Sequence, residues 1–367
     1  MTPEPPTRDT TGARLRRDHP LGTSPMPLPL EDALRADEST VGALLTRLRC
    51  PICAAAVVKE GAGVRCAGGH AVLAVDGYLD ASGGPATDGA TAGASTTSEA
   101  TARTFASFGY EWTTFSESRE EDEHYADHYL RDLDVGRIRG SVGLDAGCGR
   151  GRYTRFLAPH LDVVVALDGS DAVVSAARNL GDMPNAVVVR ADLRRAPFVD
   201  GSFGFIASFG VLHHLEDPRA GFDRLLRLLA PGGVLSLYLY SRPGQAGARG
   251  LGLAAAAALR RLTVRLSHRT LRTLSTPVAA LLFGTVVAAG RMGDALGVRR
   301  LSALPMSTYR DKPFRSLVLD TFDRLSAPIE HRFTWADLKP WFAESGLVVD
   351  SVRDDSGWFI VAHRPAT

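Results

Sequence analysis

The sequence has little lysine, few cysteines and no apolar stretch of membrane-spanning length. Only three of its 42 basic residues are lysines, a coding bias that carries no functional information. Four cysteines in 367 residues are too few for a disulfide scaffold. The longest apolar run, Pro277 to Gly290, is shorter than the roughly 20 residues that a membrane helix needs. Because no basic start followed by an apolar segment is present either, we expect a cytoplasmic protein without a transmembrane segment.

An excess of charge of one sign is also missing, since the formal net charge is only +1. A near-neutral chain gives no global reason to expect a polyanionic partner. The charge is nevertheless uneven, because the stretch from Arg242 to Arg300 holds ten arginines and one acid, Asp294. The apolar fraction of 45% is that of a globular protein with a sizeable core.

Composition divides the chain into four parts. Residues 1–40 are rich in Pro, Thr, Arg and Asp without periodicity, which predicts a disordered tail. A compact segment with cysteine and histidine covers 41–80, and 81–100 is small and polar like a flexible linker. Residues 101–367 form the main domain. We therefore expect two modules that are tethered, not fused.

The main domain alternates between short apolar runs and helical segments, the pattern of a doubly wound α/β fold with a parallel sheet. The predicted strands are Val142–Ala146, Val163–Asp168, Ala186–Arg190, Phe203–Ser208 and Val234–Tyr240. Residues 241–333 interrupt the alternation as a helical insertion after the fifth strand. Near the end, Thr334 and Asp337 predict a helix N-cap, and a closing antiparallel hairpin follows Gly346.

The sharpest motif is Leu144-Asp-Ala-Gly-Cys-Gly-Arg-Gly-Arg-Tyr153, which follows the first strand and opens a helix. Gly147, Gly149 and Gly151 allow a tight turn and a close approach of the backbone to a ligand. The spacing differs from the G-x-G-x-x-G fingerprint, whose helix receives a pyrophosphate. Asp145, two residues before the first glycine, favours a cationic ligand group instead. The alternative is a tight turn without a ligand.

Two further acids follow the next strands. Asp168 ends the second predicted strand, where a carboxylate can accept both hydroxyls of a ribose. Asp192 comes just after the third strand and could accept from an adenine amino group. Each acid alone is typical of an ordinary turn or helix cap. Together with the glycine loop they predict a nucleoside site.

The segments DAGCGRGRY, ALDGS, RADL, SFGVLHHLEDP and LLAPGGVLSLYLY resemble class I S-adenosylmethionine-dependent methyltransferases, in particular the ubiquinone/menaquinone methyltransferase-like group. The resemblance covers about Ser141 to Tyr240. It implies a seven-stranded sheet with the last strand antiparallel. It also implies that Asp145 and the three glycines line the methionine end of S-adenosylmethionine, that Asp168 holds the ribose, and that Asp192 meets the adenine. The backbone around Phe209 would contact the sugar and sulfonium side.

A second motif, C-x2-C-x12-C-x3-H, consists of Cys50, Cys53, Cys66 and His70. Four such ligands complete the tetrahedron of a structural Zn²⁺ site, and the metal would supply the folding energy that a short segment lacks. The alternative is three buried cysteines and a surface histidine. The module resembles the zinc module of bacterial rRNA guanine-N1 methyltransferases and the zinc-binding activator subunit of tRNA and protein methyltransferases. The long insertion departs from those relatives. The fourth cysteine, Cys148, is expected to be a packing residue.

Three segments are candidates for the acceptor site. The first is the pair His213 and His214 after the fourth strand, either of which could be the general base, His213 being preferred, or a structural residue. The second is an aromatic cluster ahead of the main domain: Phe105, Phe108, Tyr110, Trp112 and Phe115. The third is the insertion, for which a lid over the pocket is preferred, with an anion-binding surface or a weak contact with a membrane surface as the alternatives.

Two classes of function compete. An enzyme that methylates a small molecule, in specialised metabolism, would use the insertion as a lid that excludes water. An rRNA or tRNA base methyltransferase would use the zinc module and the Arg-rich insertion to contact phosphate. The near-neutral chain and the Leu- and Ala-rich insertion favour the small-molecule acceptor. A non-catalytic binding module is a third reading, which the intact glycine motif disfavours.

Overall fold

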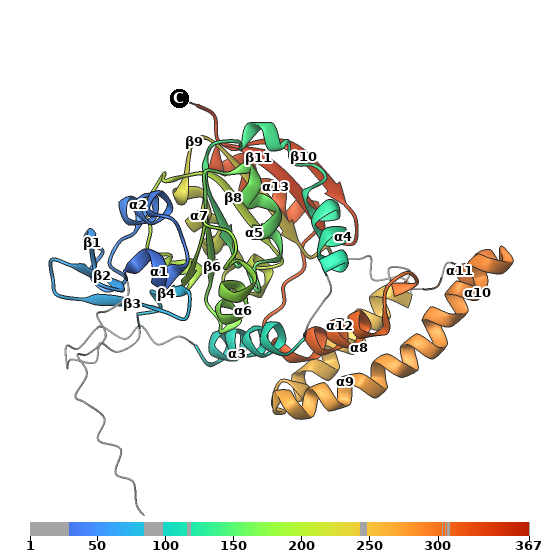
Figure 1. Cartoon of the computed structure of the whole chain (residues 1–367). Coiled ribbons are helices and arrows are strands. Elements are labelled where there is room, and N and C mark those ends of the chain that lie inside the picture. Colours follow the sequence, from blue (N-terminus) through green and yellow to red (C-terminus); the bar gives the residue numbers. More distant parts are fainter. Residues whose placement is uncertain are drawn as a thin grey trace, which may run out of the picture.

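Eleven strands form one mixed sheet at the centre of the protein (Figure 1). The computed structural model describes residues 29–83, 98–115, 119–242, 248–302, 304, 306 and 309–366. The strands lie in the order β1-β2-β3-β4-β7-β6-β5-β8-β9-β11-β10. Their bounds are β1 Val57–Glu60, β2 Gly63–Cys66, β3 Ala71–Val75, β4 Tyr78–Asp80, β5 Val142–Ala146, β6 Val163–Asp168, β7 Ala186–Arg190, β8 Phe203–Phe209, β9 Leu229–Leu239, β10 Val348–Asp354 and β11 Trp358–His363.

The expected seven strands are present within this larger sheet. Strands β4 to β9 run parallel where they pair, and β11 is antiparallel to both β9 and β10. The last strand is therefore antiparallel, as predicted. The count of seven was too low, because the N-terminal segment adds four strands to the same sheet. The inner strands β5, β6 and β7 are apolar on both faces because helices cover both sides.

The N-terminal segment is fused to the main domain, which corrects the expectation of a tether. Strand β4 pairs in parallel with β7, with Tyr78 opposite Val188, and the backbone N–H of Ala81 donates to the carbonyl of Arg190 at 2.9 Å. Leu48 makes a further bridge to Phe198. Residues 84–97 of the expected linker and residues 1–28 of the expected tail lie outside the described residues. Residues 29–40, expected to be disordered, instead contain α1 and the start of α2.

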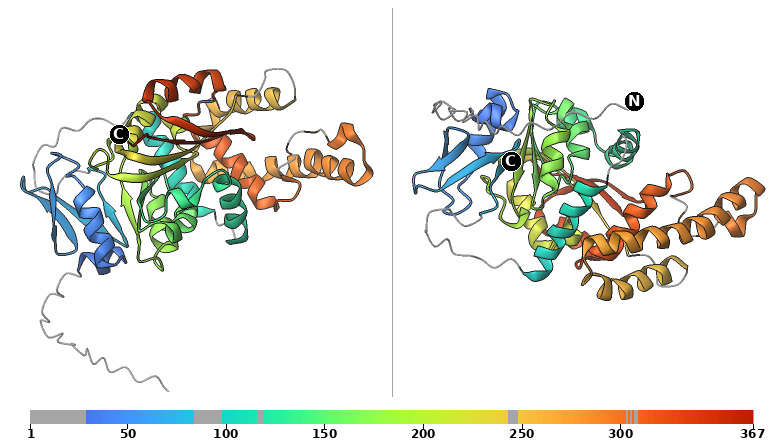
Figure 2. Two further views of the ribbon diagram at one scale, coloured as in Figure 1. Left: turned by 90° about the horizontal axis from the view of Figure 1, so that it is seen from above. Right: turned by 60° about the horizontal axis from the view of Figure 1, so that its bottom comes forward.

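Helices pack on both faces of the sheet and along one of its edges (Figure 2). Their bounds are α1 Leu30–Leu34, α2 Glu38–Arg47, α3 Glu99–Thr114, α4 Arg119–Leu130, α5 Arg152–Leu157, α6 Ala172–Asn179, α7 Pro218–Leu228 and α13 Trp335–Ser345. The predicted cap of α13 is confirmed: the Thr334 hydroxyl accepts from the N–H of Asp337, and the Asp337 carboxylate accepts from the N–H of Thr334. Gly346, with a φ of 72°, ends this helix as expected.

The insertion is helical, as predicted, and has two parts. Its helices are α8 Ala248–Thr263, α9 His268–Leu282, α10 Ala288–Leu296, α11 Arg299–Ser302 and α12 Phe314–Ser326. Helix α12 packs against α8, α9 and α3 and so joins the body of the protein. Helix α9 buries Leu271, Ser275 and Ala279, and the rod that it forms with α10 through the π-helical turn Phe283–Val287 extends away from the body as an arm (Figures 1 and 2).

The arm corrects the argument from the length of the apolar run. Because Pro277 lies inside α9 without ending it, the helical rod continues for 29 residues, from His268 to Leu296. By length and composition it is able to cross a membrane, and only 22% of its most apolar window is buried in the protein. Core helices of globular proteins can have the same length and apolar composition, so these two properties do not by themselves establish a membrane span.

Candidate functional site

The glycine loop connects β5 to α5 and lies at the carboxyl end of the parallel strands, where open α/β sheets bind ligands. Its three glycines all have positive φ, from 54° to 87°. At Gly147 a Cβ would lie 2.2 Å from a methyl carbon of Val211, so only glycine fits. The N–H of Gly149 donates to Oδ2 of Asp168 at 2.9 Å, which ties the loop to the end of β6.

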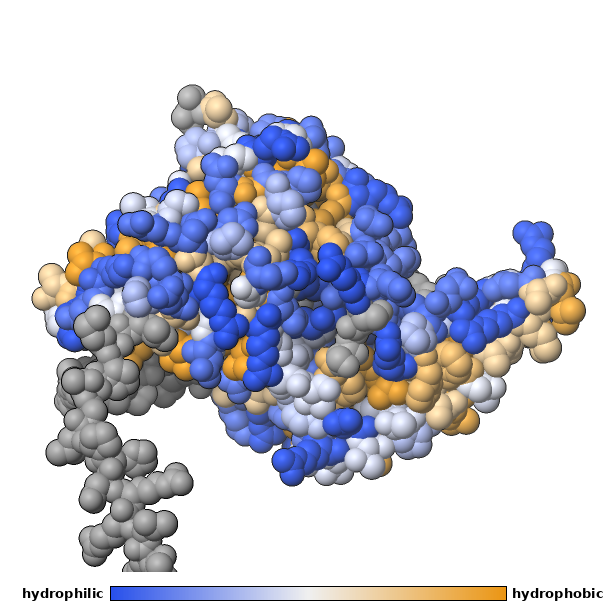
Figure 3. Space-filling view, viewed as in Figure 1, coloured by the Kyte–Doolittle hydropathy of each residue, from blue (hydrophilic) through white to orange (hydrophobic). Residues whose placement is uncertain are grey.

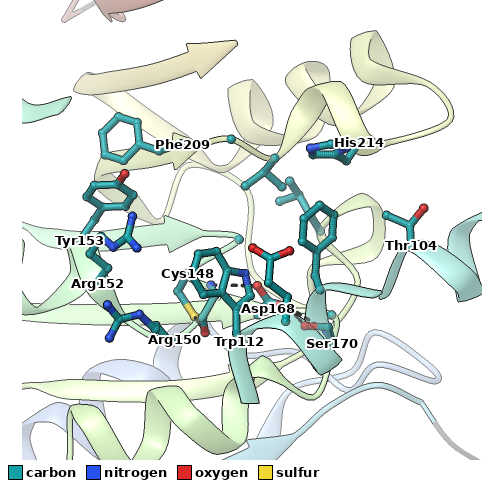
Figure 4. A pocket seen from close by; sticks show the side chains of 18 of the residues that line it. Thr104, Trp112, Cys148, Arg150, Arg152, Tyr153, Asp168, Ser170, Phe209 and His214 are labelled. Carbon is teal, nitrogen blue, oxygen red and sulfur yellow. Dashed lines mark hydrogen bonds between the residues drawn. The ribbon is translucent and has the colours of Figure 1, made fainter. Parts of the chain in front are cut away.

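Asp168 is held in one orientation. Its Oδ1 accepts from the backbone N–H of Ser170 at 2.8 Å and from the Ser170 hydroxyl at 2.7 Å. Burial raises the pKa of the Asp168 carboxyl, and these hydrogen bonds oppose that rise. A fixed, partly buried carboxylate at the tip of β6 has the geometry to accept ribose hydroxyls. Figure 4 shows Asp168 beside Trp112 and Cys148 at the glycine loop.

Asp192 lies on the same cavity, after β7, but already has a cationic partner. It accepts from the Arg194 side chain, at 3.0 Å from Nε and 2.6 Å from Nη2, and from the Arg194 backbone N–H at 2.9 Å. Such a pairing holds the side chain in place and leaves lone pairs for one more donor.

Two of the predicted cofactor residues do not line the cavity. Asp145 is 1% exposed beneath the loop, and its Oδ2 accepts from the Thr154 hydroxyl at 2.6 Å. Burial raises the pKa of Asp145 to about 6. Gly151 begins α5, where a Cβ would lie 2.9 Å from Leu180. Both residues support the loop on the side away from the cavity, whereas Gly147 and Gly149 line the cavity.

Helix α3 covers the carboxyl edge of the sheet and divides the aromatic cluster. The ring of Phe105 packs on Gly169, and the indole of Trp112 packs on Gly149. A Cβ added at these glycines would lie 2.8 Å from the Phe105 ring and 3.3 Å from the Trp112 indole. Phe108 also lines the cavity. Tyr110 and Phe115 point away and pack against Phe322 of α12.

The cavity is enclosed by the sheet edge, by α3 and by α12. Phe209 and Tyr153 lie at one end, with ring centroids 4.9 Å apart, and His214 and Thr104 lie at the other (Figure 4). Its lining includes, besides the residues above, Glu111, Tyr125, Tyr129, Cys148, Arg150, Arg152, Tyr238, Tyr240, Asp320 and Asp323. Sequence reasoning missed Tyr125, Tyr129, Asp320 and Asp323 among these, because α4 and α12 reach the cavity only through the tertiary fold.

The two histidines occupy different places. His214 lines the cavity, and its Nδ1 donates to the Ile329 carbonyl at 2.7 Å, which leaves the lone pair of a neutral ring on Nε2. His213 is fully buried behind it and stacks on Tyr240 with ring centroids 3.8 Å apart. Burial lowers the pKa of His213 well below its usual value and that of His214 to about 4.

Two arginines beside the glycine loop were also missed. Arg150 and Arg152 both contact the carboxylate of Asp122 from α4, Arg152 through Nε at 2.9 Å. The guanidinium of Arg152 also lies over the ring of Tyr125, 4.3 Å from its centroid. The pairing places two positive charges at the cavity wall near the predicted methionine end.

The second motif forms a compact ligand set in the N-terminal module. The ligand atoms of Cys50, Cys53, Cys66 and His70 all lie within 4.8 Å of one another. The Sγ atoms of Cys53 and Cys66 are 3.6 Å apart, and Nδ1 of His70 is 3.4 Å from Cys66 Sγ and 3.6 Å from Cys50 Sγ. Cys148, the fourth cysteine, lies buried in the glycine loop far along the chain from this cluster.

The α/β part of the chain is similar to known methyltransferases. Residues 144–237 match the family described as Methyltransferase domain. An uncharacterised protein of Synechococcus is 38% identical over 114 residues, 29% of this chain and 27% of that protein. Demethylmenaquinone methyltransferase of Clavibacter sepedonicus is 36% identical over 30% of this chain and 45% of its own length.

Among solved structures, an N-methyltransferase of Bradyrhizobium japonicum in complex with S-adenosyl-L-homocysteine is similar at 25% identity. The match covers 38% of this chain and 74% of that one, with a TM-score of 0.35. The chain spans half or less of the length of the curated relatives named above. Its α/β part has the class I S-adenosylmethionine-dependent methyltransferase fold.

Proposed function

We propose that the protein transfers a methyl group from S-adenosylmethionine to a small-molecule acceptor of specialised metabolism. The observation that carries this proposal is the hydrogen bond from Gly149 to Asp168, in a loop where no Cβ fits at Gly147. A backbone cradle next to a fixed carboxylate suits a nucleoside ligand. The family match over 144–237 supports the same reading.

The residues present fit the cofactor. Asp168 would accept the ribose hydroxyls, Asp192 would accept the adenine amino group, and Phe209 would lie near the sulfonium. Asp145 would act from behind, by fixing the loop through Thr154. When bound, the cofactor supplies an electrophilic methyl group on its sulfonium. The chain itself then has to orient the acceptor, exclude water and accept a proton.

A small acceptor is favoured over RNA by how the insertion uses its charges. Arg260, which would have been a phosphate contact, is instead paired with the buried carboxylate of Glu330 at 2.6 Å. Helices α3 and α12 both line the cavity, so the acceptor must fit between them. RNA recognition needs an exposed basic surface that leads to the site. The RNA alternative would rest on the N-terminal cysteine and histidine module and on the exposed arginines of the insertion.

The test is to incubate the protein with methyl-labelled S-adenosylmethionine and either rRNA or a metabolite extract of small molecules. Label recovered in the small-molecule fraction supports the proposal. Label in rRNA favours the alternative, and label in neither fraction, despite cofactor binding, contradicts both.

We further propose that the N-terminal module holds one structural Zn²⁺. For bond lengths of roughly 2.3 Å to sulfur and 2.0 Å to nitrogen, a tetrahedron has edges of about 3.8 Å between sulfurs and about 3.5 Å from sulfur to nitrogen. Three of the six separations between these ligand atoms are 3.4 to 3.6 Å, close to those edges, and all six are within 4.8 Å. Four protein ligands leave no position for a substrate, so the role would be structural.

The proton acceptor stays a proposal as well. Of the two histidines, the geometry favours His214, which lines the cavity, over His213, which the sequence had favoured. A pKa near 4 makes His214 a weak proton acceptor at neutral pH, however. Turnover of His213→Ala and His214→Ala at saturating cofactor tests both. A loss of roughly 10²-fold or more marks a base, and near-normal turnover marks a bystander.

The arm supports a proposed contact with a membrane surface. Five exposed apolar residues recur along it at helical spacing: Leu274, Val278, Leu281, Met292 and Leu296. At 100° per residue, the three residues on α9 fall within an arc of about 60° and the two on α10 within about 40°, so each helix carries an apolar stripe, and the π-helical turn between them rotates one stripe relative to the other. Apolar colour follows the arm, with polar residues beside it (Figure 3). Such a stripe on an Arg-rich segment is typical of helices that lie in the surface of an anionic bilayer.

A further inference from the structure

Three carboxyl groups that no motif predicted meet on one wall of the cavity. Glu111 comes from α3, and Asp320 and Asp323 come from α12 of the insertion. All three line the same cavity as Gly147 and Asp168. The fold therefore brings acids from two segments, about 200 residues apart in sequence, next to the proposed cofactor site.

Two of these groups lack a complete set of partners. Glu111 is only 3% exposed, and its Oε2 has no hydrogen-bond partner among the described residues. Oδ1 of Asp323 is likewise buried and unpartnered, while its Oδ2 is 3.4 Å from the Tyr240 hydroxyl. Buried polar atoms without partners cost stability and are rare in folded proteins. Such atoms in a cavity wall point to a ligand that donates hydrogen bonds.

Nearby arginines only partly balance this pair. Arg324 and Arg260 attract the Asp323 carboxylate, which Asp320 and Glu330 repel. Arg324 is shared with Asp320, which also accepts from the Tyr309 hydroxyl, and Arg260 is bonded to Glu330 at 2.6 Å. On the other side, Arg152 is bonded to Asp122 and acts on Glu111 only as the weakest of its electrostatic neighbours. These arginines bond to other groups, so the unpartnered oxygens of Glu111 and Asp323 are left for a cationic donor from a ligand.

Burial, followed by repulsion from Asp323 and Asp320, raises the pKa of Glu111 well above its usual value. Burial likewise raises the pKa of Asp323 to about 6. Both acids are thus harder to ionise than free carboxyls, Glu111 more so than Asp323, as expected for two acids that share a buried site and titrate together.

The rings around the acids suit a cation too. Tyr240, Trp112 and Tyr125 line the cavity, and aromatic faces attract organic ammonium groups. An alcohol acceptor would develop negative charge on oxygen during deprotonation, which two neighbouring carboxyls oppose. An amine acceptor develops positive charge, which they stabilise.

We propose that Glu111 and Asp323 bind the amino group of the acceptor and that Asp323 takes its proton, so that the enzyme methylates an amine nitrogen. This inference rests on the proposed methyltransferase function. The ammonium group gives one proton to the Asp323 carboxylate, which leaves two neutral groups in a desolvated site. The nitrogen lone pair then forms the N–C bond as the C–S bond breaks, and its electron pair stays on sulfur. The products are a methylated ammonium and S-adenosylhomocysteine.

The experiment compares matched probes on the protein loaded with S-adenosylhomocysteine. Phenethylamine and 2-phenylethanol differ only in the amino and hydroxyl groups, and calorimetry at pH 7.5 measures both. We expect the amine to bind at least about tenfold more tightly, because one charge-assisted hydrogen bond is worth about 1.5–3 kcal/mol. Asp323→Asn should abolish this preference, and Glu111→Gln should reduce it. Asp294→Asn, which removes an acid on the arm outside the cavity, should leave it unchanged.

A second readout separates the acceptor from the cofactor, which also carries an ammonium group. In both variants the affinity for S-adenosylhomocysteine should stay within about threefold of the wild type. Equal binding of the two probes, a preference that survives in Asp323→Asn, or no binding of either probe overturns the proposal. So does a tenfold loss of cofactor affinity in Glu111→Gln, which would assign the acid to the cofactor. If the wild type does not bind S-adenosylhomocysteine at all, the proposed function fails rather than this inference alone.

Discussion

Tyr78 and Val188 face each other on neighbouring parallel strands, and through this pair the N-terminal module continues the sheet of the methyltransferase fold. Val188 is two residues before the end of β7, and Asp192 is two residues after it. The cysteine and histidine cluster, through Cys66 on β2, and the predicted adenine-binding acid are thus connected by three continuous strand pairings rather than by a linker.

Removal of the metal should therefore destabilise the whole protein. Cys66→Ser, or chelation of the wild type, should lower the melting temperature by at least about 5 °C, because a structural Zn²⁺ contributes several kcal/mol. Elemental analysis should find one zinc per chain in the wild type. Lys59→Met is the matched control, since it removes only an exposed ion pair with Glu31 in the same module. A metal-free protein with unchanged melting would rule out the structural site.

The buried acid Glu111 should make stability depend on pH. Its pKa is raised in the folded state, so the folded protein keeps a proton that the unfolded chain loses above pH of about 4.5. Unfolding then releases a proton, and the free energy of unfolding falls as the pH rises, by at most about 1.4 kcal/mol per pH unit for one group. After burial, repulsion from Asp323 and Asp320 contributes to the raised pKa of Glu111, and attraction by Arg152 opposes it.

Glu111→Gln should flatten this dependence between pH 5 and 8. Urea denaturation of both proteins at each pH measures it. Between pH 5 and pH 8 the variant should lose less stability than the wild type, because it has no carboxyl at this position to ionise. If the two curves run parallel over this range, Glu111 is ionised in the folded protein and the acid pair does not titrate as described.

The apolar stripe on the arm should bind anionic vesicles. The wild type should sediment with vesicles of phosphatidylcholine and phosphatidylglycerol and much less with phosphatidylcholine alone. Leu281→Ser, at a position 67% exposed, should lower the partition by about tenfold, because burial of a leucine is worth about 1.5–3 kcal/mol. Leu73→Ser on β3, 62% exposed, is the matched control and should bind like the wild type. Equal binding of both variants would contradict a role for the stripe.

Local signals in the sequence were sufficient for the α/β part. The boundaries of β5, β6 and β7 agree with the predicted runs, because strands buried on both faces are apolar throughout. The cap at Thr334 and the glycine loop carry their own chemistry and were predicted for that reason. The fusion of β4 to β7 was not, because a strand of three residues leaves no periodic pattern.

The acceptor side of the cavity could not be predicted for a different reason. Glu111 stands in an aromatic segment where it looks like a solvent-facing residue, and Asp323 stands in a helix of mixed polarity. Only the packing of α12 on α3 buries them together. Likewise His213 and His214 are neighbours in sequence, yet a turn of 3-10 helix places one in the cavity and the other behind it.

The central claim is that the glycine loop and Asp168 form the S-adenosylmethionine site, and calorimetric titration with S-adenosylhomocysteine tests it most directly. The wild type should bind one molecule per chain with a dissociation constant in the micromolar range, an order-of-magnitude expectation. Asp168→Ala should weaken binding at least about tenfold, since it removes the ribose acceptors and releases the loop at Gly149. Asp182→Ala, which removes an exposed ion pair with Arg155, should bind like the wild type. Equal affinity of the wild type and Asp168→Ala, or no binding by the wild type, would contradict the account.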